Sequence, residues 1–449
     1  MKVLKFDAYT DNLFRIFFTR DSRMDIKTFH PQETETNIWE EKDWEILVMS
    51  LFDVDKYFLQ DDSEKNIEGM KKLLENTDHD FKIYIDGLGE GSDIGTRWYF
   101  LFKFCYLFNL HPNRINLFLT AMNVEKCYTT WINSPEDLQQ LRDETSKDFM
   151  VDKVKNFIPF NYYDNDYISF VYFGVNKFIN RDNTINRMGG SYNRLYETDG
   201  LFLKPNRELR KHKILSLVAN PMTHRLVVQT HLFQNGYDKE GLVSFNTDLS
   251  DFDKNVLHPT MLKNFKLYKY YNEEFLKQLP IRLDWEEFDT TQSFVGRYSP
   301  NYDFYNSTYF SVVCETNYEM NLESNGFRDC IHYPIFLTEK TLNALWSYHP
   351  FLIVNAKGSL QKLKELGFET FSELFDESYD NEFDPQKRLK MVLSEIDRVM
   401  KLDKEELHKI YWSMEDKFIH NRNKILDIVL NETPKVYQDL QKILNVREI

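Results

Sequence analysis

Short apolar runs alternate with helical patterns in the second half of this chain, and this alternation constrains its fold most. The run ILSLVA (214–219) precedes a helix-like segment at 222–237, and LVSFN (242–246) follows it. The order of strand, helix and strand recurs over 309–355. Parallel strands need a long crossover connection, so this alternation predicts a parallel sheet covered by helices.

The first half shows a similar alternation. Its apolar runs predict strands at 44–52, 81–86 and 115–122, and its periodic segments predict helices at 65–77, 96–108 and 134–144. Further helices are expected at 260–279 and, as three consecutive amphipathic segments, from 385 to 449. The 449 residues also exceed what one core usually serves. We therefore predict an α/β protein with Rossmann-like domains at 1–205 and 206–400 and C-terminal helices at 401–449.

Composition argues against several other classes of protein. The four cysteines form no C-x-x-C pair and have no histidines at zinc-finger spacing, which disfavours a disulfide framework or a structural metal site. No stretch approaches the roughly 18 apolar residues of a membrane span, so we expect a cytoplasmic protein without a membrane partner. The net charge of −15 disfavours a surface that wraps nucleic acid broadly, although it permits a local basic groove.

The segment 336–354 carries the most informative chemistry. Thr338 occupies the position of a helix N-cap, and the apolar positions that follow have helical spacing. The start of such a helix offers backbone N–H groups and a positive dipole end to a phosphate. Glu339 could accept hydrogen bonds from ribose hydroxyls, and Lys340 supplies a point charge for a diphosphate. A capped helix whose Glu339 and Lys340 are merely solvated is the competing interpretation.

The neighbouring motifs stand in a recognisable order. Glu315-Thr316 ends an apolar run, Thr338-Glu339-Lys340 begins the next helix, and His349-Pro350 opens the strand after it. This order over roughly 200–400 resembles the donor-binding region of GT-B glycosyltransferases, particularly fucosyltransferase-like enzymes and related proteins of large tailed phages.

The resemblance implies a GT-B fold, in which two Rossmann-like domains face a central cleft, and the transfer of a sugar from a nucleoside diphosphate to a hydroxyl acceptor. A UDP-sugar carrying glucose or a pentose such as arabinose is the implied donor. Glu339 and Lys340 would contact the ribose and phosphates, and Glu315 with Thr316 would line the sugar pocket. Thr316 replaces the Asn that is common in fucosyltransferases, which leaves the donor's identity open.

A second group of polar residues follows the run 214–219. Asn220, His224 and Arg225 lie where a strand end feeds a helix start, the place at which open α/β sheets bind ligands. Arg225 could bind a diphosphate bidentately, and similar phage proteins carry an Asn and a His-Arg pair here. Ser244, at the end of the next predicted strand, could face the same cleft. Alternatively, these residues only form a turn and a packed helix.

A basic run precedes this unit and comprises Lys204, Arg207, Arg210 and Lys211. It could steer a phosphate-rich acceptor towards the cleft, or it could be a solvated linker between domains. The phage resemblance implies one acceptor, hydroxymethylcytosine in duplex DNA, in the host cytoplasm. A stacked base would then have to be extruded from the duplex.

An inverting transfer also needs a base that faces the acceptor hydroxyl. The loop after 81–86 offers Asp86 and Glu90 among three glycines, although this loop is equally compatible with a solvated turn. No DxD motif ends an apolar strand, so we expect no obligatory metal or cofactor, with Lys340, Arg225 and the helix dipole offsetting the leaving charge. A glycan- or protein-modifying fucosyltransferase-like enzyme and a non-catalytic scaffold that retains the fold are the alternative functions.

Overall fold

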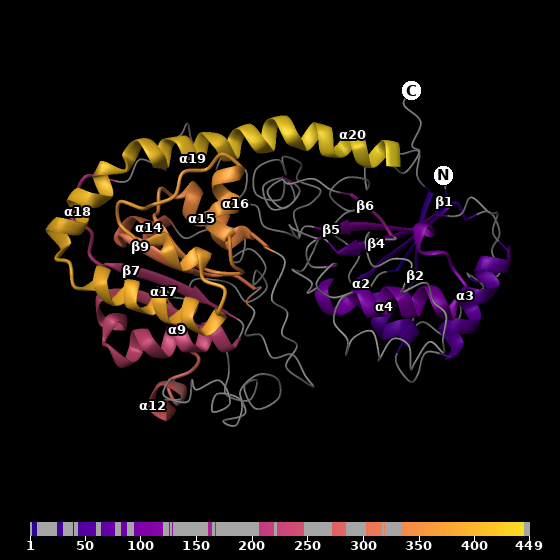
Figure 1. The fold of residues 1–449 in the computed structure, drawn as a ribbon, viewed down its shortest axis with the longest axis horizontal. Coiled ribbons are helices and arrows are strands. Elements are labelled where there is room, and N and C mark those ends of the chain that lie inside the picture. Colours follow the sequence, from indigo (N-terminus) through magenta and orange to yellow (C-terminus); the bar gives the residue numbers. More distant parts are fainter. Residues whose placement is uncertain are drawn as a thin grey trace. The chain divides into compact units, whose positions relative to one another are not determined.

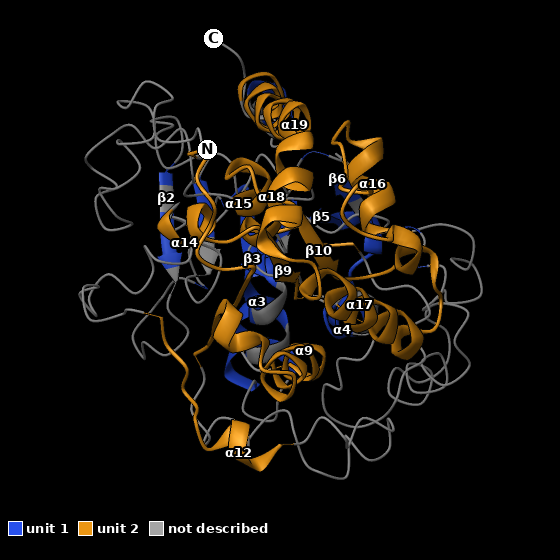
Figure 2. Cartoon of the chain, turned by 90° about the vertical axis from the view of Figure 1, so that its left-hand side faces the viewer, with its two compact units in different colours: residues 1–172, 332–334, 434–449 blue, residues 173–331, 335–433 orange. Residues whose placement is uncertain are grey.

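The chain folds as two compact α/β units (Figure 1). One unit comprises residues 1–172, 332–334 and 434–449, and the other comprises residues 173–331 and 335–433 (Figure 2). The structure is a computed structural model that describes residues 2–6, 25–29, 39, 44–59, 64–76, 82–87, 94–119, 125, 128, 160–163, 167, 206–219, 222–246, 272–283, 302–316, 318 and 335–443.

The first unit contains a parallel sheet in the order β2-β1-β3-β4-β5-β6. The predicted strands are present as β3 (Ile46–Ser50), β4 (Lys82–Gly87) and β5 (Ile115–Leu119). Three further strands were not predicted. They are β1 (Lys2–Phe6), β2 (Asp25–Phe29) and β6 (Asn161–Tyr163).

Strand β3 ends earlier than its apolar sequence indicates. The prediction extends the strand to residue 52, whereas helix α2 (Leu51–Val54) begins directly after Ser50. The Asp53 carboxylate accepts a hydrogen bond from the Ser50 backbone N–H at 2.7 Å, and the Ser50 hydroxyl accepts one from the Asp53 N–H at 3.1 Å. This reciprocal cap starts the helix, so local polar contacts override the apolar pattern.

Helices α3 (Glu64–Asn76) and α4 (Ile94–Leu107) agree with the predicted segments. Helix α4 lies along one face of the first sheet (Figure 1). Its residue Trp98 is fully buried and packs edge-on against Tyr128 and nearly parallel to Phe160. The helix expected at 134–144 lies outside the described residues.

The second unit contains a parallel sheet in the order β10-β9-β7-β8. Its strands are β7 (Ile214–Val218), β8 (Gly241–Phe245), β9 (Phe310–Cys314) and β10 (Phe351–Val354). Strands β7 and β8 coincide with the runs predicted at 214–219 and 242–246 to within one residue at either end, and β9 and β10 lie within the alternation predicted over 309–355. Every residue of β9 and β10 is buried, which explains their continuous apolar sequences. The prediction of an α/β protein with two parallel sheets is therefore confirmed.

Helices cover both faces of the second sheet (Figure 1). Helices α9 (Thr223–Gln234) and α17 (Pro385–Met400) lie on one face, and α15 (Glu339–Trp346) lies on the other. Shorter helices complete the unit: α12 (Glu273–Leu276), α14 (Tyr302–Ser307) and α16 (Ser359–Glu365). Of the helix predicted at 260–279, only residues 272–279 are described, and there the prediction is wrong in part: α12 begins after its extended N-cap Asn272, whose side chain accepts hydrogen bonds from the Glu274 and Phe275 N–H groups.

In the described residues 385–443 there are four α-helices, rather than the three predicted over 385–449. After α17 come α18 (Lys404–Ser413), α19 (Glu415–Asp427) and α20 (Thr433–Ile443). Residues 401–433 belong to the second unit, whereas residues 434–449 belong to the first. The Tyr163 hydroxyl on β6 accordingly donates a hydrogen bond to Asp439 on α20 at 3.4 Å. Among the described residues, no helix is long and apolar enough to span a membrane.

The start of β8 leaves no room for a side chain. Gly241 pairs with Ile214 of β7, and a Cβ atom built on it would lie 2.3 Å from Ile214 Cγ2 and 2.8 Å from its carbonyl oxygen. We predict that Gly241→Ala lowers the local free energy of unfolding by about 1–3 kcal/mol, measured by native-state amide exchange in β7 and β8.

Gly236 provides the control for this substitution. It has a φ of 71°, and a Cβ atom there would meet no other atom within 4 Å. Because Asn tolerates this left-handed conformation, Gly236→Asn should change the free energy by less than about 1 kcal/mol. Equal effects of the two substitutions would contradict the steric explanation.

Candidate functional site

The carboxyl edge of the second sheet brings the predicted residues together. From β7 the chain passes to β8 on one side, and β9 then pairs with the other side of β7. The connections that leave the carboxyl ends of β7 and β9 therefore diverge to opposite sides, and such a switch point is where open α/β sheets bind ligands. Arg225 lies in the first turn of the helix after β7, and Glu315 and Thr316 directly follow β9.

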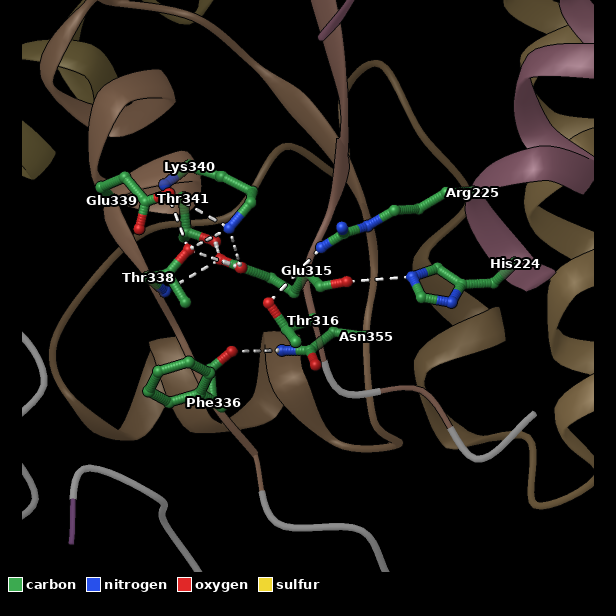
Figure 3. Close-up of polar contacts among 10 residues, drawn as sticks. All are labelled: His224, Arg225, Glu315, Thr316, Phe336, Thr338, Glu339, Lys340, Thr341 and Asn355. Carbon is green, nitrogen blue, oxygen red and sulfur yellow. Dashed lines mark hydrogen bonds and ion pairs between the residues drawn. The ribbon is translucent and has the colours of Figure 1, made fainter. Parts of the chain in front are cut away.

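The Glu315 carboxylate is buried at the start of helix α15 (Figure 3). Its Oε1 accepts hydrogen bonds from the Thr338 backbone N–H at 2.9 Å and from the Thr341 hydroxyl at 2.6 Å. Its Oε2 accepts one from the Thr338 hydroxyl at 2.6 Å. These donors compensate for the loss of hydration that a buried carboxylate suffers. Glu315 thus joins the end of β9 to the beginning of α15.

Thr338 is the N-cap of α15, as the sequence predicts. Its hydroxyl oxygen accepts hydrogen bonds from the Lys340 backbone N–H at 3.3 Å and from the Lys340 ammonium at 3.0 Å. The ammonium also contacts Glu339 Oε1 at 3.1 Å and lies 3.6 Å from Glu315 Oε2. About a third of the Lys340 side chain is exposed. Lys340 therefore remains accessible to an anion while its position is defined by the cap.

Arg225 approaches the same strand end from helix α9 (Figure 3). It is only 4% exposed, and its Nη2 donates a hydrogen bond to the hydroxyl of the half-buried Thr316 at 3.4 Å. Burial lowers the pKa of the Arg225 guanidinium, while Cys314, Glu315 and Glu339 act in the opposite direction. The two glutamates that surround Lys340 therefore also influence Arg225. Arg225 of α9 and Lys340 of α15 thus both contact the segment that follows the carboxyl end of β9, as the sequence predicts.

His224 anchors the backbone at this edge. It is fully buried, and its Nε2 lies 2.9 Å from the Glu315 carbonyl oxygen. A carbonyl oxygen can only accept, so this nitrogen carries the proton. The imidazole also stacks on Tyr318, with ring centroids 5.1 Å apart. The predicted donor-binding residue His224 therefore holds the end of β9 in place through main-chain contact.

Two residues at the site were not singled out in the sequence. The Asn355 side chain, just after β10, donates a hydrogen bond to the Phe336 carbonyl oxygen at 3.1 Å and so holds the segment that leads into α15. Thr341 contributes the third hydrogen bond to Glu315. The signal for Thr341 is its position three residues after the cap, on the side of the helix that bears Thr338.

Four other predicted site residues complete the comparison with the sequence. Ser244 is buried in β8, in register with Leu217. Asp86 is the penultimate residue of β4, where its backbone pairs with Ser50 of β3. Asn220 and Glu90 lie outside the described residues.

The basic run before β7 is only partly a surface feature. Arg207 is exposed, stacks on Trp412 with 4.0 Å between its Cζ and the ring centroid, and pairs with Glu415. Lys211 is also exposed, and Lys204 lies outside the described residues.

Arg210 corrects the prediction of a continuous basic surface. It is only 4% exposed, donates hydrogen bonds to the carbonyl oxygens of Tyr305, at 2.7 Å, and Thr308, and stacks on the Tyr411 ring. These partners occupy the guanidinium inside the second unit, so Arg210 contributes to packing and does not extend the exposed basic run of Arg207 and Lys211.

His349 lies just before the amino end of β10, whereas Glu315 is bonded to Val354 at the carboxyl end of that strand. Its Nδ1 accepts a hydrogen bond from the Ser311 hydroxyl at 2.7 Å, and its Nε2 donates to the Thr308 carbonyl oxygen at 2.8 Å. Burial, together with the charge of Arg210, lowers the pKa of His349 to about 3. The imidazole is therefore neutral, and its role is to fix the amino end of β10.

No family model and no curated protein matches the chain. Among the solved structures that resemble it is a UDP-forming alpha,alpha-trehalose-phosphate synthase from Burkholderia vietnamiensis, at 10% identity and a TM-score of 0.34, covering 97% of this chain and 99% of that chain. An alpha,alpha-trehalose 6-phosphate synthase from Burkholderia multivorans follows, at 9% identity and 0.32, covering 89% and 81%. Similarity at this level assigns no substrate or activity to this chain.

The neutral His349 makes stability depend on pH. The unfolded chain binds a proton at His349 below its ordinary pKa of about 6.5, while the folded chain does not until about pH 3. Acidification between these values therefore favours unfolding, by about 1.4 kcal/mol per pH unit from this residue. We predict that the free energy of unfolding, measured with urea, decreases less steeply from pH 6 to pH 4.5 in His349→Asn than in the wild type. Above pH 7 the two proteins should show the same dependence on pH. Identical slopes across the acidic range would contradict this assignment.

Proposed function

We propose that this chain is a glycosyltransferase of the GT-B type, which binds the diphosphate of a nucleotide-sugar donor at the carboxyl edge of its second sheet. The convergence of Arg225 and Lys340 on the Glu315-Thr316 segment carries this proposal (Figure 3). A second supporting observation is the strand order, which places a switch point between β7 and β9.

The charges suit an anionic leaving group. Lys340 provides a compact, partly exposed charge, and Arg225 provides a planar guanidinium with several donors. Helix α15 adds the positive end of its dipole beside Lys340. These groups are held in place before a ligand arrives, so little reorganisation is needed when charge develops on the leaving diphosphate.

Glu339 is suited to a different part of the donor. It lies in the first turn of α15, partly exposed, and is paired with Lys340 at 3.1 Å. Ribose hydroxyls are hydrogen-bond donors that a carboxylate accepts, so a bound nucleoside would draw Glu339 towards the sugar. A diphosphate would then replace Glu339 as the partner of Lys340. Thr316, half-buried beside Arg225, would contact the transferred sugar.

The transfer itself joins the anomeric carbon to an acceptor hydroxyl oxygen as the bond to the diphosphate oxygen breaks. In an inverting reaction the acceptor proton passes to a carboxylate, for which we propose Asp86 or Glu90 of the first unit. A retaining reaction needs no such base. UDP leaves with the developed negative charge on its terminal phosphate, where Lys340 and Arg225 offset it.

We propose a UDP-sugar, with glucose or a pentose, as the donor and hydroxymethylcytosine in DNA as the acceptor, as the phage resemblance implies. The exposed Arg207 and Lys211 could contact DNA phosphates. A hydrolysis screen over UDP- and GDP-sugars identifies the donor without an acceptor. Duplexes with and without hydroxymethylcytosine then test the acceptor. Transfer only to the duplex that contains hydroxymethylcytosine would support the proposal, and no transfer to either duplex would favour a glycan or protein acceptor.

The loss of Lys340 should impair donor binding selectively. We predict that Lys340→Ala weakens UDP binding in calorimetry and slows donor hydrolysis by about 100-fold, because one preorganised charge at the leaving group is removed. Lys390→Ala is the matched control, since Lys390 is exposed on α17, and it should behave like the wild type. Wild-type affinity in Lys340→Ala would contradict the proposed donor site, and the absence of UDP and GDP binding altogether would favour a scaffold.

A further inference from the structure

We infer that Glu315 is a positioning residue for donor binding, which acts by fixing the start of α15 and does not touch the donor. This inference deepens the proposed function and rests on it. The Glu315 side chain is fully buried, and both carboxylate oxygens accept hydrogen bonds from Thr338 or Thr341. A ligand at the edge of the sheet therefore cannot reach this carboxylate.

The Thr338 hydroxyl transmits the effect of Glu315 to Lys340. A hydroxyl has a single proton, and at 2.6 Å from Glu315 Oε2 this proton is donated to the carboxylate. The lone pairs of the Thr338 oxygen consequently face the Lys340 ammonium and backbone N–H, which donate to it. The direction of this chain of hydrogen bonds is set by Glu315, because a carboxylate can only accept.

Glu315 is itself held by two other elements. Its backbone N–H donates to the Val354 carbonyl oxygen of β10 at 3.0 Å, and its carbonyl oxygen accepts from His224 of α9 at 2.9 Å. One residue thus connects β9, β10, α9 and α15. Since α9 also carries Arg225, the same residue sets the placement of both cations relative to the sheet edge.

The variant Glu315→Gln tests this role with little change in shape. An amide has one accepting oxygen, so the Thr338 hydroxyl must turn or lose its acceptor. We expect the Kd of UDP to rise about tenfold, as for the loss of one hydrogen bond to a charged group. The KM of the donor should rise with it, whereas kcat should change little. Amide exchange over residues 338–342 of the unliganded protein should become faster.

Glu395→Gln provides the matched control. Glu395 is a buried carboxylate of the same unit, pairs with Arg398 and accepts from the Asp376 N–H at 2.7 Å, far from α15 in sequence. Its substitution also removes a buried negative charge, but it should leave the Kd of UDP and the exchange over 338–342 unchanged. A tenfold weakening in this control would overturn the inference, because it would show a general effect of lost stability.

A double-mutant cycle separates positioning from direct contact. If Glu315 acts through Lys340, then Glu315→Gln should weaken UDP binding less than about twofold in the Lys340→Ala background. A full tenfold effect in that background would overturn the inference.

If the wild type binds no UDP, the proposed function fails. Amide exchange still tests whether Glu315 fixes the start of α15. Unchanged exchange over residues 338–342 in Glu315→Gln would overturn that role.

Discussion

The buried Glu315 carboxylate is the interaction on which the organisation of the second unit's edge depends. A carboxylate removed from water is costly unless donors replace its hydration, and three donors from Thr338 and Thr341 do so here. All three come from the first turn of α15 and its cap. The helix is therefore fixed against the sheet by a polar contact with defined geometry, in addition to the apolar face of the helix.

This contact also explains how a site for an anion can exist in an acidic protein. Lys340 and Arg225 are the cations at the strand end, and Glu315 and Glu339 are the nearby carboxylates. Glu315 accepts hydrogen bonds from three neutral donors and also forms an ion pair with the Lys340 ammonium at 3.6 Å. Among the described carboxylates, only Glu339 accepts a hydrogen bond from the Lys340 ammonium, and Glu339 is partly exposed. In the proposed site a diphosphate would replace the hydrogen bond to this surface carboxylate, which costs little, while Glu315 keeps its Thr338 and Thr341 donors.

The sequence predicts the second sheet well because its strands are short, apolar and bounded by helical segments. The cap at Thr338 and the meeting of Arg225 with Lys340 follow from the same pattern, because the carboxyl ends of parallel strands share one edge. The burial of Arg210 could not be predicted, since its aromatic and carbonyl partners come from distant segments. Strands β1 and β2 were missed because charged residues interrupt their apolar sequences, KVLKF and DIKTF.

The central claim is that Lys340 and Arg225 together bind the diphosphate of the donor. A crystal structure of the protein with UDP tests it most directly. The account predicts the phosphates within ion-pair distance of both the Lys340 ammonium and the Arg225 guanidinium, with the ribose against Glu339 and the Glu315 carboxylate still bonded to Thr338. A diphosphate bound away from the carboxyl ends of β7 and β9, or contacting neither cation, would contradict it.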